Sequence, residues 1–145
     1  MPGWIATGFK EYIKRMPREA RIELHEIKPE PRTTGKPVVK IMETEAQRIL
    51  SILPQNCLCI ALDEHGKKLT TSQLSTQMRG WMQGGLDVAF IIGGADGLHD
   101  SVKQAAQQLM SLSALTMPHA FVRVLLAEQL YRAHSLMHNH PYHRE

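Results

Sequence analysis

The chain lacks the features that mark membrane proteins, secreted proteins and strongly basic nucleic-acid-coating proteins. Its 145 residues include only two cysteines, and no apolar run approaches the roughly 20 residues of a membrane-spanning helix. The N-terminus has no signal-peptide pattern, because polar residues interrupt its apolar ones. The formal net charge is only +3, which does not by itself imply a nucleic-acid partner. We therefore expect a cytoplasmic protein without a membrane partner.

Several motifs that identify common enzyme classes are also missing. Gly93, Gly94 and Gly97 have the spacing GGxxG, and no Lys-Ser or Lys-Thr pair follows, which argues against a dinucleotide fingerprint and against an ATPase. No GxSxG elbow indicates a serine hydrolase. His134 and His138 have the i, i+4 spacing that could hold zinc, but no HExxH motif or nearby thiolate accompanies them. We expect no metal site.

The apolar residues, 43% of the chain, are enough for one core. Their spacing alternates between helical and strand periods without a repeat or linker, so a single domain over residues 1–145 is expected. A turn is predicted at residues 63–68, and the basic, proline-rich segment 28–37 is expected to be mobile. Helices are predicted at 4–16, 38–53, within 70–85, 99–109 and 118–137, and strands at 21–27, 57–62, 87–92 and 110–117.

Strands that alternate with helices in this way predict an α/β fold, with a mostly parallel sheet flanked by helices. In open parallel sheets, ligands bind outside the carboxyl ends of the strands. That rule points to Leu62–Asp63, Gly93–Gly94 and Met117–Pro118, and to the end of the strand predicted at 21–27. A binding site built from these strand ends is the expectation.

Two of these strand ends carry distinctive residues. In "GGADG", the glycines allow a close approach of backbone to a ligand, but a tight strand-to-helix turn would need them equally. In "SLSALTMPH", Ser111, Ser113 and Thr116 are possible donors to a ligand, or caps that bond to their own backbone. The residues alone leave both pairs of alternatives open.

The C-terminal "MHNHPYHRE" is unusually rich in groups that donate hydrogen bonds or titrate near neutral pH. Three interpretations fit it: a metal site, a disordered tail, or a polar tail packed at a functional site. The third interpretation would place Tyr142, His143 and Arg144 against a ligand.

Taken together, "IIGGADGL", "SLSALTMPHAFVRVLLAEQLYRA" and "NHPYHRE", with "GWIATGFKEYIKR" near the start, closely resemble the RlmH (YbeA) family of SPOUT-class methyltransferases. The resemblance covers essentially the whole chain. It implies an enzyme that uses S-adenosylmethionine to methylate N3 of a pseudouridine in the 23S rRNA of the ribosome, with no DNA partner. It also implies a trefoil knot in the C-terminal part of the sheet, which no spacing or periodicity indicates.

The resemblance also implies where the cofactor and the second subunit bind. The family works as a homodimer with its last helix near the interface, and here that helix carries Phe121, Val122, Leu125, Leu126 and Leu130. The implied cofactor-binding residues, matched motif by motif, are Leu62, Gly93, Leu112, Ser113, Ala114, Leu115, Thr116 and Met117.

For catalysis, the resemblance directs attention to the tail. A uracil-type N3–H ionises well above neutral pH, so hydrogen-bond donors near the base carbonyls would favour the reactive anion. We expect Tyr142, His143 and Arg144 to serve that role, with His119 and Arg132 as second candidates and Glu128 orienting an arginine. The expected RNA-binding residues are Arg123, Arg132 and Arg144, together with Arg32, Lys36 and Lys40.

The chain departs from the family pattern at its start. Family members begin with a hydrophobic strand and a glycine turn, whereas this sequence starts at "MPGW", so we expect that strand to be missing. Two other functions are considered: a non-catalytic ribosome- or RNA-binding protein with the same fold, and a nucleotide- or metal-binding module.

Overall fold

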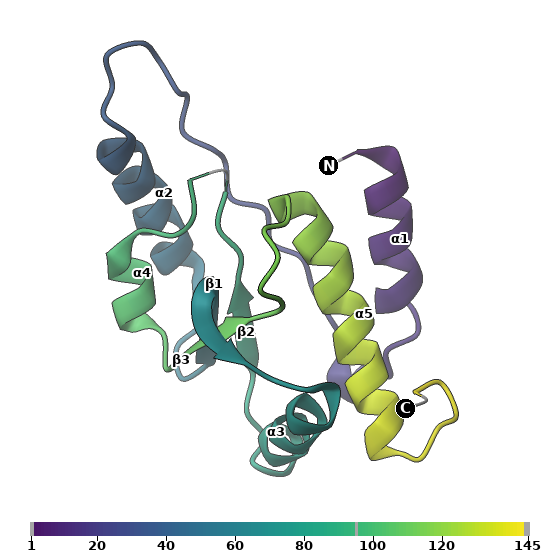
Figure 1. Ribbon diagram of the computed structural model, residues 1–145. Coiled ribbons are helices and arrows are strands. Elements are labelled where there is room, and N and C mark those ends of the chain that lie inside the picture. The colour runs from purple at the N-terminus through teal and green to yellow at the C-terminus, as the bar shows by residue number, and fades with distance from the viewer. Residues whose placement is uncertain (1, 95, 144–145) are drawn as a thin grey trace. The chain divides into compact units, whose positions relative to one another are not determined.

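The computed structural model describes residues 2–94 and 96–143, and its helices and strands form two compact units (Figure 1). One unit consists of residues 1–24, 68–86 and 115–145 and contains helices; we call it the helical unit. The other consists of residues 25–67 and 87–114 and contains a three-stranded sheet with the order β2-β1-β3; we call it the sheet unit.

The sheet unit is built on a parallel pair of strands. Leu58 of β1 (Leu58–Lys68) pairs with Val88 of β2 (Val88–Ile91), and the parallel register continues to Ala61 and Ile91. Strand β3 (Gln108–Ser111) lies along the other side of β1. The α/β class predicted from the alternation of strands and helices is therefore confirmed.

Helices α2 (Val38–Ile52) and α4 (Asp100–Ala105) pack together over this sheet. Small side chains on the strands allow close packing, and Val102 of α4 is fully buried. Burial of such a side chain contributes about 1.5–3 kcal/mol to folding. The core of this unit consists of buried residues from α2, β1, β2, the loop before α4 and α4 itself. In that order they are Ala46, Cys59 and Ala61, Ile91, Leu98 and Val102.

In the helical unit, α5 (His119–Met137) packs against both α1 (Gly3–Ile13) and α3 (Thr71–Gln83). The buried Ser75 of α3 donates a hydrogen bond to the carbonyl of Ala133, at 2.9 Å. Thr70 begins α3 with a capping box, in which its side chain accepts from the Gln73 amide and the Gln73 side chain accepts from the Thr70 amide. The cap is thus Thr70, one residue before the start of α3 at Thr71. A short 3₁₀ helix, η1 (Arg18–Ala20), follows α1.

The strand predicted at residues 21–27 is wrong, because the structure assigns no strand there. The alternation of apolar and charged residues does not produce a buried face: Leu24 is 40% exposed, and Ile22 is only partly buried. An alternating pattern is stable as a strand only where one face is covered and the backbone pairs with a neighbour.

The turn predicted at residues 63–68 is also wrong, since β1 continues to Lys68. Gly66 explains the continuation: a Cβ at this position would lie 2.6 Å from the backbone nitrogen of Met110, so only glycine permits this contact with β3. The glycine that suggested a turn is instead a site of close approach between two backbones.

The region between α4 and α5 also differs from the prediction. The helix expected at 99–109 ends at Ala105, and the strand expected at 110–117 begins at Gln108 and ends at Ser111. The sheet accounts for the shift, because the Gln107 amide donates to the Cys59 carbonyl and the Cys59 amide donates to the Gln107 side chain. His99 caps the start of α4, and its side chain accepts from the Ser101 amide.

Within the described parts of the chain, no helix has the length and apolar character required to cross a membrane. The segment 28–37 has no regular helix or strand, but ion pairs of Arg32 with Glu45 and Asp96, and of Glu30 with Arg48, tie it to neighbouring elements. The knot and the single-domain organisation stay predictions.

Candidate functional site

The glycine loop, residues 93–98 between β2 and α4, is a tight turn that its glycines make possible. A Cβ at Gly93 would lie 2.7 Å from the carbonyl carbon of Gly97, which is closer than any real side chain comes. Gly97 has a φ of +81°, in the region that glycine adopts without strain. Its amide donates to the Gly94 carbonyl at 3.1 Å and closes the loop. The glycine spacing is therefore explained by backbone geometry before any ligand is considered.

The strand register places two of the expected cofactor residues on adjacent strands. Leu62 directly follows Ala61, whose partner in β2 is Ile91, and Gly93 lies just beyond that partner. Gly93 thus lies just beyond the end of β2, the usual place for a ligand in parallel sheets, whereas Leu62 lies within β1, where the parallel pairing with β2 stops. The strand end expected at Leu62–Asp63 is wrong, because β1 continues to Lys68, and both residues stay predicted cofactor positions.

The remaining expected cofactor residues follow β3. The Ser111 hydroxyl donates to the Ser113 carbonyl at 2.9 Å, so Ser111 stabilises its own backbone. Residues 112–114 belong to the sheet unit, together with Leu62 and Gly93, whereas Leu115, Thr116 and Met117 belong to the helical unit. The structure therefore groups part of the expected cofactor set within one unit.

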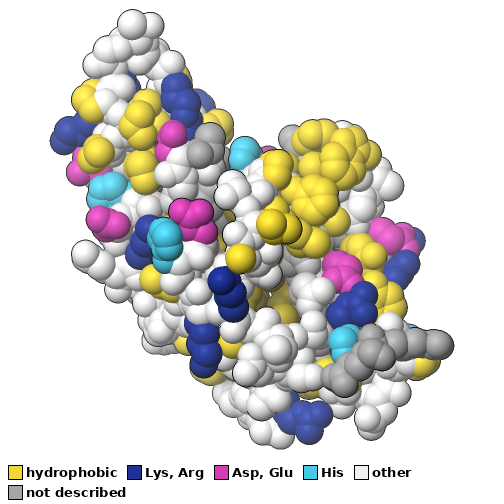
Figure 2. All heavy atoms as spheres, viewed as in Figure 1, with side chains coloured by type: hydrophobic (Ala, Val, Ile, Leu, Met, Phe, Trp, Pro, Cys, Tyr) yellow, Lys and Arg dark blue, Asp and Glu magenta, His cyan; other side chains and the backbone are white. Residues whose placement is uncertain are grey.

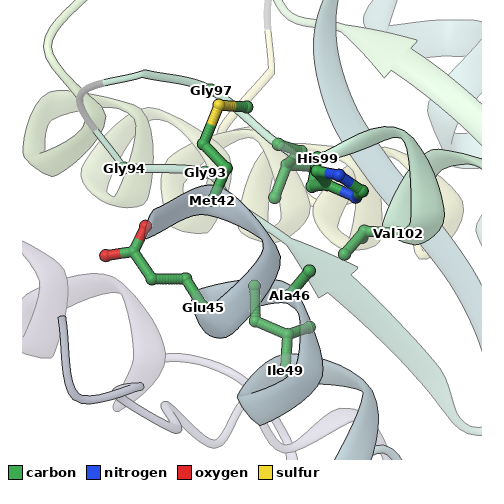
Figure 3. A pocket seen from close by; sticks show the side chains of 10 residues that line it. Met42, Glu45, Ala46, Ile49, Gly93, Gly94, Gly97, His99 and Val102 are labelled. Atoms are coloured by element: carbon green, nitrogen blue, oxygen red, sulfur yellow. The ribbon is translucent and has the colours of Figure 1, made fainter. Parts of the chain in front are cut away.

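A hollow lies between α2 and the glycine loop (Figure 3). Its cavity volume is about 20 Å³, roughly the room for one water molecule, and Met42 and Glu45 of α2 extend toward Gly93 and Gly94 across it. The sequence did not indicate α2 as part of the site, because the spacing of its apolar residues predicted only a helix with one apolar side. The complete lining is Met42, Glu45, Ala46, Ile49, Gly93, Gly94, Gly97, Leu98, His99 and Val102.

In the helical unit, the C-terminal tail packs back onto α1 and α5 through Tyr142. The Tyr142 hydroxyl donates to Glu128 Oε1 at 3.2 Å and lies 3.5 Å from the Tyr12 hydroxyl. Its ring meets the Tyr131 ring edge-on, with centroids 4.7 Å apart, and the Arg132 guanidinium stacks over it at 4.8 Å. As far as Tyr142 and His143, the tail is thus a packed segment.

Electrostatics keeps Tyr142 protonated and Arg132 charged. Burial raises the pKa of Tyr142, and the nearby Tyr12 hydroxyl and Glu128 carboxylate raise it further. The Glu128 carboxylate, 2.7 Å from Arg132, raises the pKa of that guanidinium by hydrogen bonding. The cluster therefore presents a phenol that can donate but cannot serve as a base near neutral pH.

The other residues expected in catalysis fall in different places. His143 Nδ1 lies 3.5 Å from the Arg132 guanidinium, so these two predicted residues are brought together. His119 is the exposed first residue of α5. Arg144 lies outside the described residues. Glu128 does orient an arginine, as expected, and it also accepts from Tyr142, which the sequence did not indicate.

Several basic residues expected at RNA are already paired with carboxylates. Arg132 pairs with Glu128, and Arg32 pairs with Asp96 and Glu45. The further pairs join Lys36 to Glu30 and Lys40 to Glu43, whereas Arg123 is partly buried on α5.

His134 of α5 and the C-cap residue His138 have rings tilted by 46°, with centroids 4.5 Å apart. Burial lowers the pKa of His134, and the neighbouring His138 lowers it further, so the ring is neutral at physiological pH. Among the residues that the structure describes, no group of three or more His, Cys, Asp or Glu side chains has the arrangement of a metal site.

Apolar side chains gather on the surface at the beginning of α1 and α5 (Figure 2). Trp4 is 67% exposed and Phe121 is 40% exposed, and their rings meet edge-on at 6.4 Å. Leu126 and Leu130, also expected at a subunit interface, are buried within the chain. Trp4 and Phe121 thus form an exposed aromatic pair at the first turns of the two helices, and Val38, Val39, Ile52 and Leu115 are exposed elsewhere.

Comparison with known proteins identifies the relatives of this chain. A family model described as "Predicted SPOUT methyltransferase" matches residues 1–143. A protein of Paraburkholderia xenovorans named ribosomal RNA large subunit methyltransferase H is 59% identical over 144 residues, which are 99% of this chain and 92% of the relative. A protein of the same name from Methylobacillus flagellatus is 57% identical over 145 residues, 100% of this chain and 93% of the relative. Another, from Nitrosospira multiformis, is 56% identical over 144 residues, with 99% and 92% covered.

Proposed function

Because the chain is an enzyme that belongs to the SPOUT methyltransferase family, in its ribosomal RNA large subunit methyltransferase H group, we propose that it methylates large-subunit ribosomal RNA. The finer proposal is that the target is N3 of a pseudouridine in 23S rRNA, within the ribosome, and that S-adenosylmethionine is the methyl donor. The 59% identity to an enzyme of that name over nearly the whole chain carries the proposal of large-subunit rRNA methylation, and the finer proposal rests on the resemblance of the sequence motifs.

The residues of the glycine loop fit this cofactor. When bound, S-adenosylmethionine supplies a methyl group carried on a positively charged sulfur. It has no phosphate, and the described part of the loop has no lysine or arginine that would bind one. Nothing lies within 4 Å of a Cβ built on Gly94, so its backbone can be approached closely from that side. The residues that would hold the cofactor are Leu62, Gly93, Leu112, Ser113, Ala114, Leu115, Thr116 and Met117.

The tail supplies the groups for the target base. Tyr142 stays protonated because its pKa is raised, and its proton is donated to Glu128, so Tyr142 is not the acceptor of the N3 proton and instead holds the tail in place. His143 and Arg144 follow it directly and would interact with the base carbonyls or a phosphate, which favours the anionic form of the base. Most of the rate enhancement then comes from positioning, since no strong base is required.

RNA affinity would come from phosphate contacts by Arg123, Arg132 and Arg144. With a net charge of only +3, such a small domain recognises the shape of the ribosome and does not read a long sequence. The exposed rings of Trp4 and Phe121 support a homodimer, because large apolar side chains on a surface favour association. We place this single-domain enzyme in the cytoplasm, without membrane or DNA partners, and propose the family's trefoil knot for its C-terminal part.

The proposal is tested with ribosomes from a strain that lacks this modification. The purified protein and S-adenosylmethionine carrying a labelled methyl group should label the large-subunit RNA at one pseudouridine, located by mass spectrometry of nuclease fragments. Binding of S-adenosylmethionine without labelling would favour the non-catalytic ribosome-binding alternative, and heat of binding with only zinc or ATP would favour the binding-module alternative.

A variant without the last four residues, Tyr142 to Glu145, tests the role of the tail. Its turnover should fall far more than its affinity for S-adenosylmethionine, measured by calorimetry. An equal loss of turnover and cofactor affinity would refute a role for the tail at the target base.

A further inference from the structure

We propose that Arg32 is a positioning residue for the glycine loop, which it holds in place against α2, and that it is not an RNA contact. The inference deepens the proposed function, because it rests on cofactor binding by the loop that contains Gly93. It reverses two expectations: that the basic segment 28–37 is mobile, and that the cationic side chain of Arg32 binds RNA.

The contacts of Arg32 join two walls of the hollow. Its Nε and Nη2 atoms both donate to Asp96 Oδ2, at 3.1 and 2.8 Å, and Asp96 lies in the glycine loop between Gly94 and Gly97. Its Nη1 atom lies 3.5 Å from Glu45 Oε2, and Glu45 is the α2 residue that extends toward the loop in Figure 3. One guanidinium therefore bridges the two elements that enclose the hollow.

The basic segment that carries Arg32 is itself held in place. The Glu30 amide donates to Glu45 Oε2 at 3.1 Å, and the Glu30 carboxylate pairs with Lys36 and with Arg48 of α2, each at 2.6 Å. The Glu30 and Glu45 side chains are only 15% and 17% exposed. Because these contacts share residues, the network orders the segment more firmly than isolated surface ion pairs would.

A contact with another segment, such as the pair between Asp96 and Arg32, can order the glycine loop. Its residues at 93, 94 and 97 have no side chains, so they cannot fix the loop by packing, and glycine has the greatest backbone freedom to lose on ordering. A loop that binds a ligand through its backbone binds more tightly when it is ordered beforehand. Asp96 is the charged side chain within this turn through which a neighbouring segment holds it.

Arg32 has little capacity left for a phosphate. The three nitrogens of its guanidinium already face Asp96, Glu45 and the Glu30 carbonyl, which accepts from Nη1 at 3.3 Å. Hydrogen bonding to Asp96 also raises the pKa of Arg32. To contact RNA, the side chain would have to give up carboxylate partners from two different elements.

The test compares Arg32→Gln, Asp96→Asn and the double variant in the full-length protein. Each single variant should weaken binding of S-adenosylmethionine by about tenfold, measured by calorimetry, while kcat at saturating cofactor and the KM for ribosomes stay close to wild type. The double variant should be no weaker than the worse single variant, because both remove the same contact. Arg32→Lys should recover part of the affinity, since it keeps the charge but not the two parallel donors.

Hydrogen exchange measures the loop without any cofactor. The amides of residues 96–98 should exchange about tenfold faster in Arg32→Gln than in the wild type. Arg21→Gln is the matched control, because Arg21 forms an exposed pair with Glu23, at 2.6 Å, and should change neither measurement. If wild-type protein bound no S-adenosylmethionine, the proposed function would fail, yet exchange would still decide whether Arg32 holds the loop.

The proposal is overturned if Arg32→Gln leaves cofactor affinity and loop exchange unchanged. An accompanying rise in the KM for ribosomes would then assign Arg32 to RNA. A general loss of thermal stability, with faster exchange throughout the sheet unit, would instead make the residue a structural one and would also contradict the proposal.

Discussion

The glycine loop of the sheet unit and the C-terminal tail of the helical unit are ordered by different kinds of contact. The loop owes its conformation to missing side chains: Gly93 touches the Gly97–Leu98 backbone, and Gly97 takes a positive φ. The tail owes its conformation to large side chains, because Tyr142 packs on Tyr131, Arg132 and Glu128. Adding atoms should therefore disrupt the conformation of the loop, and removing atoms should detach the tail.

The largest effect is expected for Gly93→Ala. The new methyl group would lie 2.7 Å from the Gly97 carbonyl carbon, so the loop must move, at a cost of about 1–3 kcal/mol in the free energy of unfolding. Binding of S-adenosylmethionine should fall with it. Thermal unfolding and calorimetry measure both changes.

Gly94→Ala is the matched control for Gly93→Ala, because nothing lies within 4 Å of a Cβ at Gly94. It should unfold at nearly the wild-type temperature. Similar destabilisation by both substitutions would contradict the view that backbone contact at one position sets the loop conformation.

The second prediction removes atoms from the cluster that holds the tail. Glu128→Ala takes away the acceptor for Tyr142 and the ion partner of Arg132, whose side chain is only 27% exposed. The tail should detach, and kcat for ribosome methylation should fall by as much as about 100-fold, the scale of a misplaced reacting group. Affinity for S-adenosylmethionine should not change. Steady-state kinetics measures kcat, and calorimetry measures the affinity for S-adenosylmethionine.

Glu43→Ala is the control for Glu128→Ala, since Glu43 pairs with the exposed Lys40 at 3.3 Å on α2. This variant should keep the wild-type kcat. An equal loss in both variants would mean that any removed carboxylate matters, and the particular role of Glu128 would be refuted.

The difference between the two regions also explains what the sequence revealed. Glycine spacing and strand order are local, so the parallel strands, the tight turn after β2 and the position of Gly93 just beyond that strand could be predicted. Contacts between residues far apart in the chain could not. Arg32 meets Asp96 and Tyr12 meets Tyr142 only after folding, and nothing in either local pattern indicates its partner.

The errors in predicted secondary structure have the same origin. Gly66 indicated a turn by its local preference, but its contact with the Met110 backbone keeps it within β1. Residues 21–27 alternate like a strand, but Leu24 is 40% exposed and the structure assigns no strand there. In each case a contact in the folded protein, or its absence, outweighed local propensity.

The third prediction uses pH to test the state of Tyr142. Its pKa is raised in the folded protein, so the protonated phenol contributes stability that is fully present below the ordinary tyrosine pKa of about 10. That contribution should be lost as the pH rises above this value, and the tail should detach in strongly alkaline solution. Urea unfolding between pH 8 and 11 should show a steeper decline for wild type than for Tyr142→Phe.

At neutral pH, Tyr142→Phe keeps the ring contacts and loses only the hydroxyl, so kcat should fall by about fivefold, the scale of one hydrogen bond. Parallel pH profiles of stability for the two proteins would contradict a raised tyrosine pKa. A complete loss of turnover would mean that the hydroxyl acts on the substrate itself.

The smallest effect concerns the two thiols at the start of β1, which report on the sheet unit alone. Cys57 and Cys59 are both free, with sulfur atoms 3.5 Å apart, as expected for a reduced pair. Burial, together with the hydrogen bond to Cys57, raises the pKa of Cys59 to about 11. Because the thiolate is the reactive form, a maleimide at pH 7.5 should label the partly exposed Cys57 first and Cys59 slowly, as mass spectrometry of peptides would show.

Gly93→Ala should accelerate the slow labelling of Cys59, since Cys59 shares a core with Ile91 and Leu98 beside the glycine loop, whereas Glu128→Ala should not. Equal acceleration by both variants would show that the loop and the tail are not held independently, and the contrast between them would have to be abandoned.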